Sequence, residues 1–83
     1  MTDLTRNPTQ LGAIIQRARK QRGWTQAELG RRTGLRQATI SLIETGNPAA
    51  KLETILAVLA ALDLEIQIAP RAKSRTLNIE DIL

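Results

Sequence analysis

Four residues within a six-residue stretch carry groups that can read the edges of DNA bases. The guanidinium of Arg36 can contact guanine or a phosphate, and the amide of Gln37 can make a two-point contact to adenine. Ala38 is small enough to touch the methyl group of thymine, and the hydroxyl of Ser41 can hydrogen-bond to a base edge. We therefore expect these four residues to form a base-reading set.

A second group has side chains suited to DNA phosphates, contacts that position a protein without specifying sequence. Its members are basic or polar: Thr25, Gln26, Arg19, Lys20, Arg22, Arg32 and Thr39. Thr25 and Gln26 are expected at a helix N-terminus, whose dipole favours anions. Other interpretations stay open: Thr25 can be a helix cap alone, Thr39 a neutral surface residue, and Arg19 and Lys20 a solvated helix end.

Two short helices are predicted to position both groups. Thr25 and Glu28 have the T-x-x-E spacing of a capping box, which marks the start of a first helix, and Gly34 ends it. A second helix is expected from about Arg36 to Thr45. Because only about two residues separate the helices, they must cross steeply, as they do in a helix-turn-helix.

Two further helices are expected to flank this unit. One is introduced by Asn7 and Pro8, or by Thr9 as its cap, and ends near Gly23, with apolar residues at the spacing of one helix face. The other covers about residues 52–62 and is rich in aliphatic residues. Its apolar surface is wider than one core-facing side requires, which also suggests a subunit contact. Trp24 is the one aromatic residue, and its place beside a capping position favours a core or staple role over a base-stacking platform.

The pattern changes after the last predicted helix. Leu64, Ile66 and Ile68 alternate with more polar residues before Pro70, which predicts one half-buried strand. A single strand has no partner in its own subunit, so pairing with the same strand of a second copy is favoured. Such a homodimer would suit a palindromic operator. The alternative is a short extended tail that lies on its own helices.

The basic residues lie mostly with the predicted helix-turn-helix. Residues 1–46 hold eight Lys or Arg against three Asp or Glu, a net charge of +5. Residues 47–83 hold four Lys or Arg against five Asp or Glu, a net charge of −1. A solvated cationic face would look the same, but positive charge joined to the motif indicates nucleic-acid binding.

Catalysis, cofactors and metals are not expected. The sequence has no Cys and no His, and it shows no Ser-x-x-Lys, phosphate-cradling glycine loop or paired acids. The N-terminus lacks the apolar segment of a signal peptide, and the longest apolar run, Ile55 to Leu62, is too short to span a bilayer. We expect a cytoplasmic protein without a membrane partner.

The motif resembles the Cro/C1-type (Xre) helix-turn-helix regulators. The residues that carry the resemblance are Trp24-Thr25-Gln26-x-Glu28-Leu29, Thr33-Gly34-Leu35, Gln37-Ala38-Thr39-Ile40-Ser41 and Ile43-Glu44-x-Gly46. Base-reading positions of that family match Arg36, Gln37, Ala38 and Ser41. The resemblance implies an all-α, lambda-repressor-like bundle of about four helices.

The order of segments over residues 7–70 is similar to the HipB-type antitoxins, small dimeric regulators that pair with HipA-type serine/threonine kinase toxins. The segments are NPTQLGAIIQRARKQRGWTQAEL, then RQATISLIE, then an aliphatic helix and LDLEIQIAP. This resemblance implies a homodimer with a shared strand lid. It also implies a repressor of its own operon, associated with the nucleoid when on its operator, that binds the kinase as part of a type II toxin-antitoxin system.

The expected organisation is a DNA-binding and dimerisation domain over residues 1–70, with one C-terminal strand that pairs across the homodimer, and a flexible tail over 71–83. Three aliphatic residues in the last five suggest that the tail docks on the kinase, and a disordered end is the alternative. Two other functions stay open: a stand-alone regulator without a toxin partner, and a helical interaction adaptor that has lost DNA binding.

Overall fold

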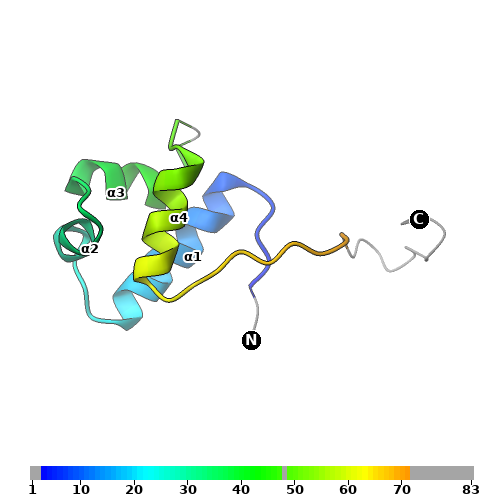
Figure 1. Cartoon of the computed structure of the whole chain (residues 1–83), viewed down its shortest axis with the longest axis horizontal. Helices are drawn as coiled ribbons and strands as arrows, with labels where there is room; N and C mark the ends of the chain where they lie inside the picture. The colour runs from blue at the N-terminus through cyan, green and yellow to red at the C-terminus, as the bar shows by residue number, and fades with distance from the viewer. Residues whose placement is uncertain (1–2, 48, 72–83) are drawn as a thin grey trace.

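The computed structural model describes residues 3–47 and 49–71, and these residues form four helices and no strand (Figure 1). Helix α1 is Pro8–Gln21, α2 is Gln26–Thr33, α3 is Gln37–Glu44 and α4 is Leu52–Ala61. All four lie within a residue or two of the predicted segments, so the predicted all-α helix-turn-helix bundle is confirmed. None of the helices in these two ranges is long and apolar enough to cross a membrane.

The first two helices begin at side-chain caps. The Asn7 carboxamide oxygen accepts a hydrogen bond from the Gln10 backbone N–H at 2.8 Å, and the Thr25 hydroxyl accepts one from the Glu28 N–H at 3.0 Å. Each such bond satisfies a backbone donor that has no partner inside the helix, which stabilises a helix by about 1 kcal/mol. The other half of the predicted capping box is absent from the described residues, because the Glu28 carboxylate pairs with Arg31 and Arg32 instead.

The turn between α2 and α3 depends on Gly34. Its φ of 74° lies in the left-handed region, where a residue without Cβ is least strained. This conformation lets the Leu35 backbone N–H reach back to the Gly30 carbonyl oxygen at 2.9 Å and stop α2 after Thr33. The predicted end of the first motif helix is therefore confirmed.

All four helices contribute to one core. Its buried members are Ile15, Leu29, Ile40, Ile43, Val58, Leu59 and Leu62. Helix α3 packs against α1 and α2, and α4 packs against α2. Trp24 is partly buried and packs against this core, as expected for a staple at the start of α2.

Helix α1 approaches the end of α3 so closely that Gly12 has no room for a side chain. A Cβ placed there would lie 2.5 Å from the Ile43 carbonyl oxygen and 2.8 Å from the Glu44 carbonyl carbon. Both neighbours are backbone atoms and cannot rotate away. The glycine therefore sets the distance between α1 and the helix that carries the predicted base-reading residues.

We expect Gly12→Ala to lower the free energy of unfolding by about 1–3 kcal/mol, the usual effect of overpacking. Helix propensity alone predicts the opposite, a gain of about 1 kcal/mol. Urea denaturation followed by circular dichroism would measure the difference. The matched control is Ala13→Gly at the exposed neighbouring position, which should lose only the propensity contribution. An increase in the free energy of unfolding on Gly12→Ala would contradict the close approach of α1 to the end of α3.

The segment after α4 leaves the helices instead of lying on them. Leu64 stays partly buried against the core, and its N–H bonds to the Leu59 carbonyl oxygen at 2.8 Å. Beyond it Ile66 is 48% exposed and Ile68 is 95% exposed, and the chain runs outward (Figure 1). The alternative of a tail lying on its own helices therefore does not describe Ile68, whereas Ile66 is about half covered. Strand pairing with a second copy stays a prediction.

The segment before α1 and the segment after α4 border one groove. Its volume is about 820 Å³, and residues from both segments line it together with Leu11 and Ile14 of α1. The two segments pass near each other in Figure 1. Residues 72–83 of the predicted tail lie outside the described residues.

Candidate nucleic-acid interface

Helix α3 has one buried side and one open side. Ile40, Ile43 and Glu44 are buried and mark the side that faces the other helices. At 3.6 residues per turn, the opposite side is formed by Ala38 and the residues around it. The second motif helix therefore presents a free face, as the helix-turn-helix pattern predicts.

The four predicted base-reading residues lie together on or beside this face. Arg36, Gln37 and Ala38 are exposed at the start of α3, and Ser41 is half-buried one turn later. Among the described residues, no hydrogen bond or ion pair engages the side chains of Arg36, Gln37 or Ser41. Because no intramolecular bond must be broken first, these groups are available to a ligand.

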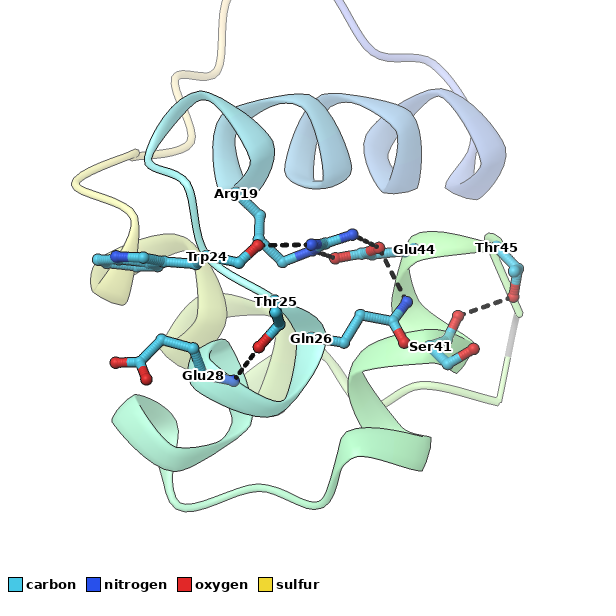
Figure 2. A network of polar contacts seen from close by, with 8 residues as sticks. All are labelled: Arg19, Trp24, Thr25, Gln26, Glu28, Ser41, Glu44 and Thr45. Carbon is cyan, nitrogen blue, oxygen red and sulfur yellow. Dashed lines mark hydrogen bonds and ion pairs between the residues drawn. The ribbon is translucent and has the colours of Figure 1, made fainter.

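A buried polar network connects the end of α3 to the neighbouring elements (Figure 2). The Arg19 guanidinium donates from Nε to Glu44 Oε2 at 2.6 Å and from Nη2 to Glu44 Oε1 at 3.1 Å. Its Nη1 donates to the Trp24 carbonyl oxygen at 2.7 Å, and Gln26 Nε2 donates to Glu44 Oε1 at 3.1 Å. The network joins α1, the loop before α2, the start of α2 and the end of α3.

The structure places Arg19, a predicted phosphate-binding residue, in a buried ion pair and not at the surface. Its side chain is only 8% exposed and the Glu44 side chain only 1%, so the pair is removed from solvent. A two-point guanidinium–carboxylate contact of this kind uses the donors that a phosphate would need. The sequence places Arg19 in a basic helix end, where a cation is normally solvated, and gives no sign that Glu44, 25 residues later, is its partner.

Thr25 and Gln26 lie at the start of α2, as predicted, and each has an intramolecular contact. The Thr25 hydroxyl accepts from a backbone N–H, so capping is part of its role, and it keeps its own proton to donate. Gln26 points towards Glu44 (Figure 2), and one of its amide protons is used there. Both residues nevertheless lie at the N-terminal end of α2.

Arg22 and Arg32 are gathered around Trp24. The Arg32 guanidinium carbon lies 4.1 Å from the centroid of the indole ring, and that of Arg22 lies 5.4 Å from it. Arg32 also pairs with Glu28 at 2.7 Å, and Arg22 donates to the Leu62 carbonyl oxygen at 2.8 Å. These contacts restrain both guanidinium groups. They also place both groups against the Trp24 ring, which agrees with the packing role predicted for Trp24.

Lys20 and Thr39 complete the predicted phosphate set. Lys20 is exposed in the last turn of α1, and Thr39 is half-buried on α3. Thr39 borders a hollow of about 330 Å³ between α3 and the start of α4, and Lys51 borders the same hollow. Lys51 is not among the residues that the sequence predicts for phosphate contacts, because it belongs to the half of the chain without excess positive charge. The turn before α4 brings it next to α3.

The region that the structure describes contains no group of three or more acidic side chains that could hold a metal ion. The open face of α3 is instead suited to hydrogen bonding and to contacts with an anionic polymer. Arg36 lies at its start, and Lys51 lines the hollow that Thr39 and Leu42 of α3 also line.

Comparison with known proteins agrees with this geometry. A family model described as "Helix-turn-helix" matches residues 15–68. The chain is 40% identical over 60 residues to antitoxin HipB of Escherichia coli strain K12 and to that of Escherichia coli O6:H1 strain CFT073. This stretch is 72% of the present chain, and it is 68% of the K12 protein and 64% of the CFT073 protein.

A solved HipA–HipB–O2–O3 complex contains a chain with the same architecture. The match has a TM-score of 0.77 at 35% identity and covers 83% of the present chain and 97% of that chain. Sequence and structure therefore agree over the helices that carry the open face. The chain belongs to the Cro/C1-type helix-turn-helix family and, within it, to the HipB antitoxins.

Proposed function

We propose that this protein is a sequence-specific DNA-binding repressor that acts as the antitoxin of a type II toxin-antitoxin system. It represses its own operon and binds a HipA-type serine/threonine kinase. The observation that carries the proposal is the open face of α3. Among the described residues, the side chains of Arg36 and Gln37 form no hydrogen bond or ion pair, and the helix is anchored by the Arg19–Glu44 pair. The HipA–HipB–O2–O3 complex supports both partners.

DNA recognition follows from the side chains on α3. Inserted in the major groove, Gln37 makes a two-point contact to adenine, Arg36 contacts guanine or a phosphate, Ala38 touches a thymine methyl and Ser41 bonds to a base edge. Because these residues are on one short helix, they read neighbouring base pairs.

Phosphate contacts position that helix. The proposed set keeps six of the predicted residues, omits Arg19 and adds Lys51: Thr25, Gln26, Lys20, Arg22, Arg32, Thr39 and Lys51. They come from the ends of α1 and α2, from α3 and from the start of α4. Contacts from several elements would orient the whole bundle on the duplex.

The repressor is a homodimer in this proposal. The chain leaves Leu52, Leu56, Ile66 and Ile68 exposed, an apolar surface that a second copy would cover. Pairing of the segments around Leu64–Ile68 would also satisfy backbone groups that have no ladder partner among the described residues. Two copies of α3 would then read a palindromic operator whose half-sites are roughly 34–36 Å apart, or a multiple of that.

Residues 1–70 form the DNA-binding and dimerisation domain in this proposal, and residues 71–83 are available to the kinase. The protein acts in the cytoplasm and is associated with the nucleoid when bound to its operator. Its role is that of a binding protein and not of an enzyme, which agrees with its membership of the HipB antitoxins.

Gln37→Ala tests the DNA assignment. We expect operator affinity to fall by about 5- to 140-fold, equivalent to about 1–3 kcal/mol, because one two-point base contact is lost. Preference should relax at one position in each half-site. Gel shifts on a duplex that the wild-type protein selects from a random pool would measure both effects.

The matched control for this test is Gln16→Ala, which removes the same amide from the exposed side of α1. It should leave affinity and preference unchanged. Lys20→Ala should instead weaken all sequences alike and reduce the salt dependence, as expected for a phosphate contact. If Gln37→Ala keeps the full base preference, α3 is not the reading helix.

The kinase partner is tested separately from DNA binding. The genes beside that of the protein are searched for a HipA-type kinase, the protein is co-expressed with that kinase, and the complex is isolated by a tag on the kinase. Copurification of the wild-type protein and of Gln37→Ala would support the antitoxin role independently of base reading. Absence of a neighbouring kinase gene, or of a complex, would leave a stand-alone regulator.

A further inference from the structure

One large apolar side chain on α3 does not take part in the core. Leu42 is 45% exposed, whereas Ile40 is fully buried and Ile43 is 3% exposed. It was not among the predicted base-reading residues, because an aliphatic residue in an amphipathic helix is normally assigned to the core.

Leu42 lies on the open side of the helix. The side that faces the bundle is marked by Ile40, Ile43 and Glu44. At 3.6 residues per turn, Leu42 is nearly opposite the centre of that side, and it follows Ala38 by four residues, about one turn. A helix that brings Ala38 to a base edge therefore also brings Leu42 towards the groove.

The surroundings of Leu42 suit DNA better than a protein partner of mixed charge. It borders the hollow between α3 and the start of α4, with Leu35, Thr39, Ala49, Ala50, Lys51 and Thr54. None of the described residues that line this hollow is acidic, and Lys51 supplies positive charge. A cation beside an exposed aliphatic group matches a phosphate beside a base methyl.

We propose that Leu42 is a further base-reading residue, which selects thymine by packing against its C5 methyl group. This inference rests on the proposed DNA-binding function and extends it. The methyl group of thymine is the one apolar group on the base edges of the major groove, so an aliphatic side chain distinguishes T·A from the other pairs there. Ala38 and Leu42, one turn apart, would contact different base pairs.

Replacement of thymine by uracil removes the methyl group and leaves base pairing intact, which makes the contact testable. The probe is a duplex that the wild-type protein selects from a random pool, with each thymine of a half-site replaced by uracil in turn. At one thymine, the wild-type protein should lose about fourfold in affinity, the factor that corresponds to about 0.8 kcal/mol for one buried methyl group.

Leu42→Ala should lose affinity for the thymine duplex by a similar factor and should no longer distinguish uracil from thymine at that position. Leu42→Met keeps the volume and should keep the discrimination. Ala38→Gly should abolish discrimination at a different thymine. Because Leu42 is half exposed, both Leu42 variants should unfold at nearly the wild-type urea concentration, which circular dichroism would verify. Ala38→Gly should unfold at a lower urea concentration, because glycine has a lower helix propensity than alanine, and its affinity is measured where it is fully folded.

The proposal is overturned if Leu42→Ala discriminates thymine from uracil at every position as the wild-type protein does. It is equally overturned if this variant changes only dimerisation or kinase binding, since the side chain would then contact a protein. Gln37→Ala distinguishes failure of the Leu42 proposal from failure of the proposed DNA-binding function. If that variant loses base preference while Leu42→Ala does not, DNA reading by α3 stands and the role of Leu42 falls.

Discussion

Glu44→Gln should lower the free energy of unfolding by about 3–5 kcal/mol, the typical cost of removing one partner of a buried ion pair. The substitution keeps the size of the side chain and removes its charge, so the Arg19 guanidinium would stay buried without a counter-charge. An 83-residue domain has about 4–12 kcal/mol of stability in total. The loss is therefore large enough to unfold much of the protein, and urea denaturation would measure it.

The control for this prediction is an ion pair of the same type on the surface. Arg17 and Asp3 pair at 3.0 Å with side chains that are 54% and 52% exposed. Asp3→Asn should cost less than about 1 kcal/mol because water solvates both charges in either state. If Asp3→Asn and Glu44→Gln lowered the free energy of unfolding by similar amounts, burial would not be the cause of the large loss predicted for Glu44→Gln.

A double substitution separates the cost of an unpaired charge from the value of the pair. Arg19→Met combined with Glu44→Leu removes both charges and fills the space with apolar side chains. It should be much less destabilising than Glu44→Gln, since apolar replacement of a buried pair is often close to neutral. DNA affinity of the folded double variant would then show whether the pair also sets the orientation of α3.

Ile66→Asp should convert the dimer to a monomer and lower operator affinity by about 10²- to 10⁴-fold, because two linked half-sites bind far more tightly than one. Ile66 is 48% exposed in the single chain, so a charge there has little effect on the fold of one copy. In the dimer it would bury an unpaired carboxylate at the strand contact. Analytical ultracentrifugation and gel shifts would measure the two effects.

Gln67→Asp is the matched control, since it introduces the same charge one residue along. Because successive strand residues point to opposite faces, Gln67 should lie on the face opposite Ile66, which it shares with Glu65, whose carboxylate accepts a hydrogen bond from the Gln67 amide. This variant should stay dimeric and keep its operator affinity. If both variants were monomeric, the added charge alone would explain the loss of the dimer, and strand pairing would not be needed to explain it. A dimeric Ile66→Asp protein would refute the strand contact.

Local features of the structure could be predicted with good accuracy because they depend on neighbouring residues. Asn7 and Thr25 cap their helices as expected, since a cap needs only a backbone N–H a few residues later. Gly34 ends α2 for a similar reason, because its left-handed conformation requires no distant partner. The helix bounds and the exposed start of α3 follow from the same kind of information.

Charged side chains were the least predictable part of the site. Their conformations depend on which opposite charge or aromatic ring lies within reach in space. Glu28 takes Arg31 and Arg32 as partners in place of the Thr25 N–H, and Arg32 also stacks near Trp24. The proposed phosphate-binding residues are therefore chosen by where they lie in the structure and by their charge.

By itself, the sequence determined the helix-turn-helix, its bounds and the identity of the residues at the start of α3, because caps, turns and apolar spacing act over a few residues. Only the tertiary structure decided which polar side chains are engaged in contacts within the chain. It brought Glu44 to Arg19 across 25 residues and left Leu42 outside the core. The physical reason is that burial and charge pairing depend on distances between helices, which local sequence patterns do not encode.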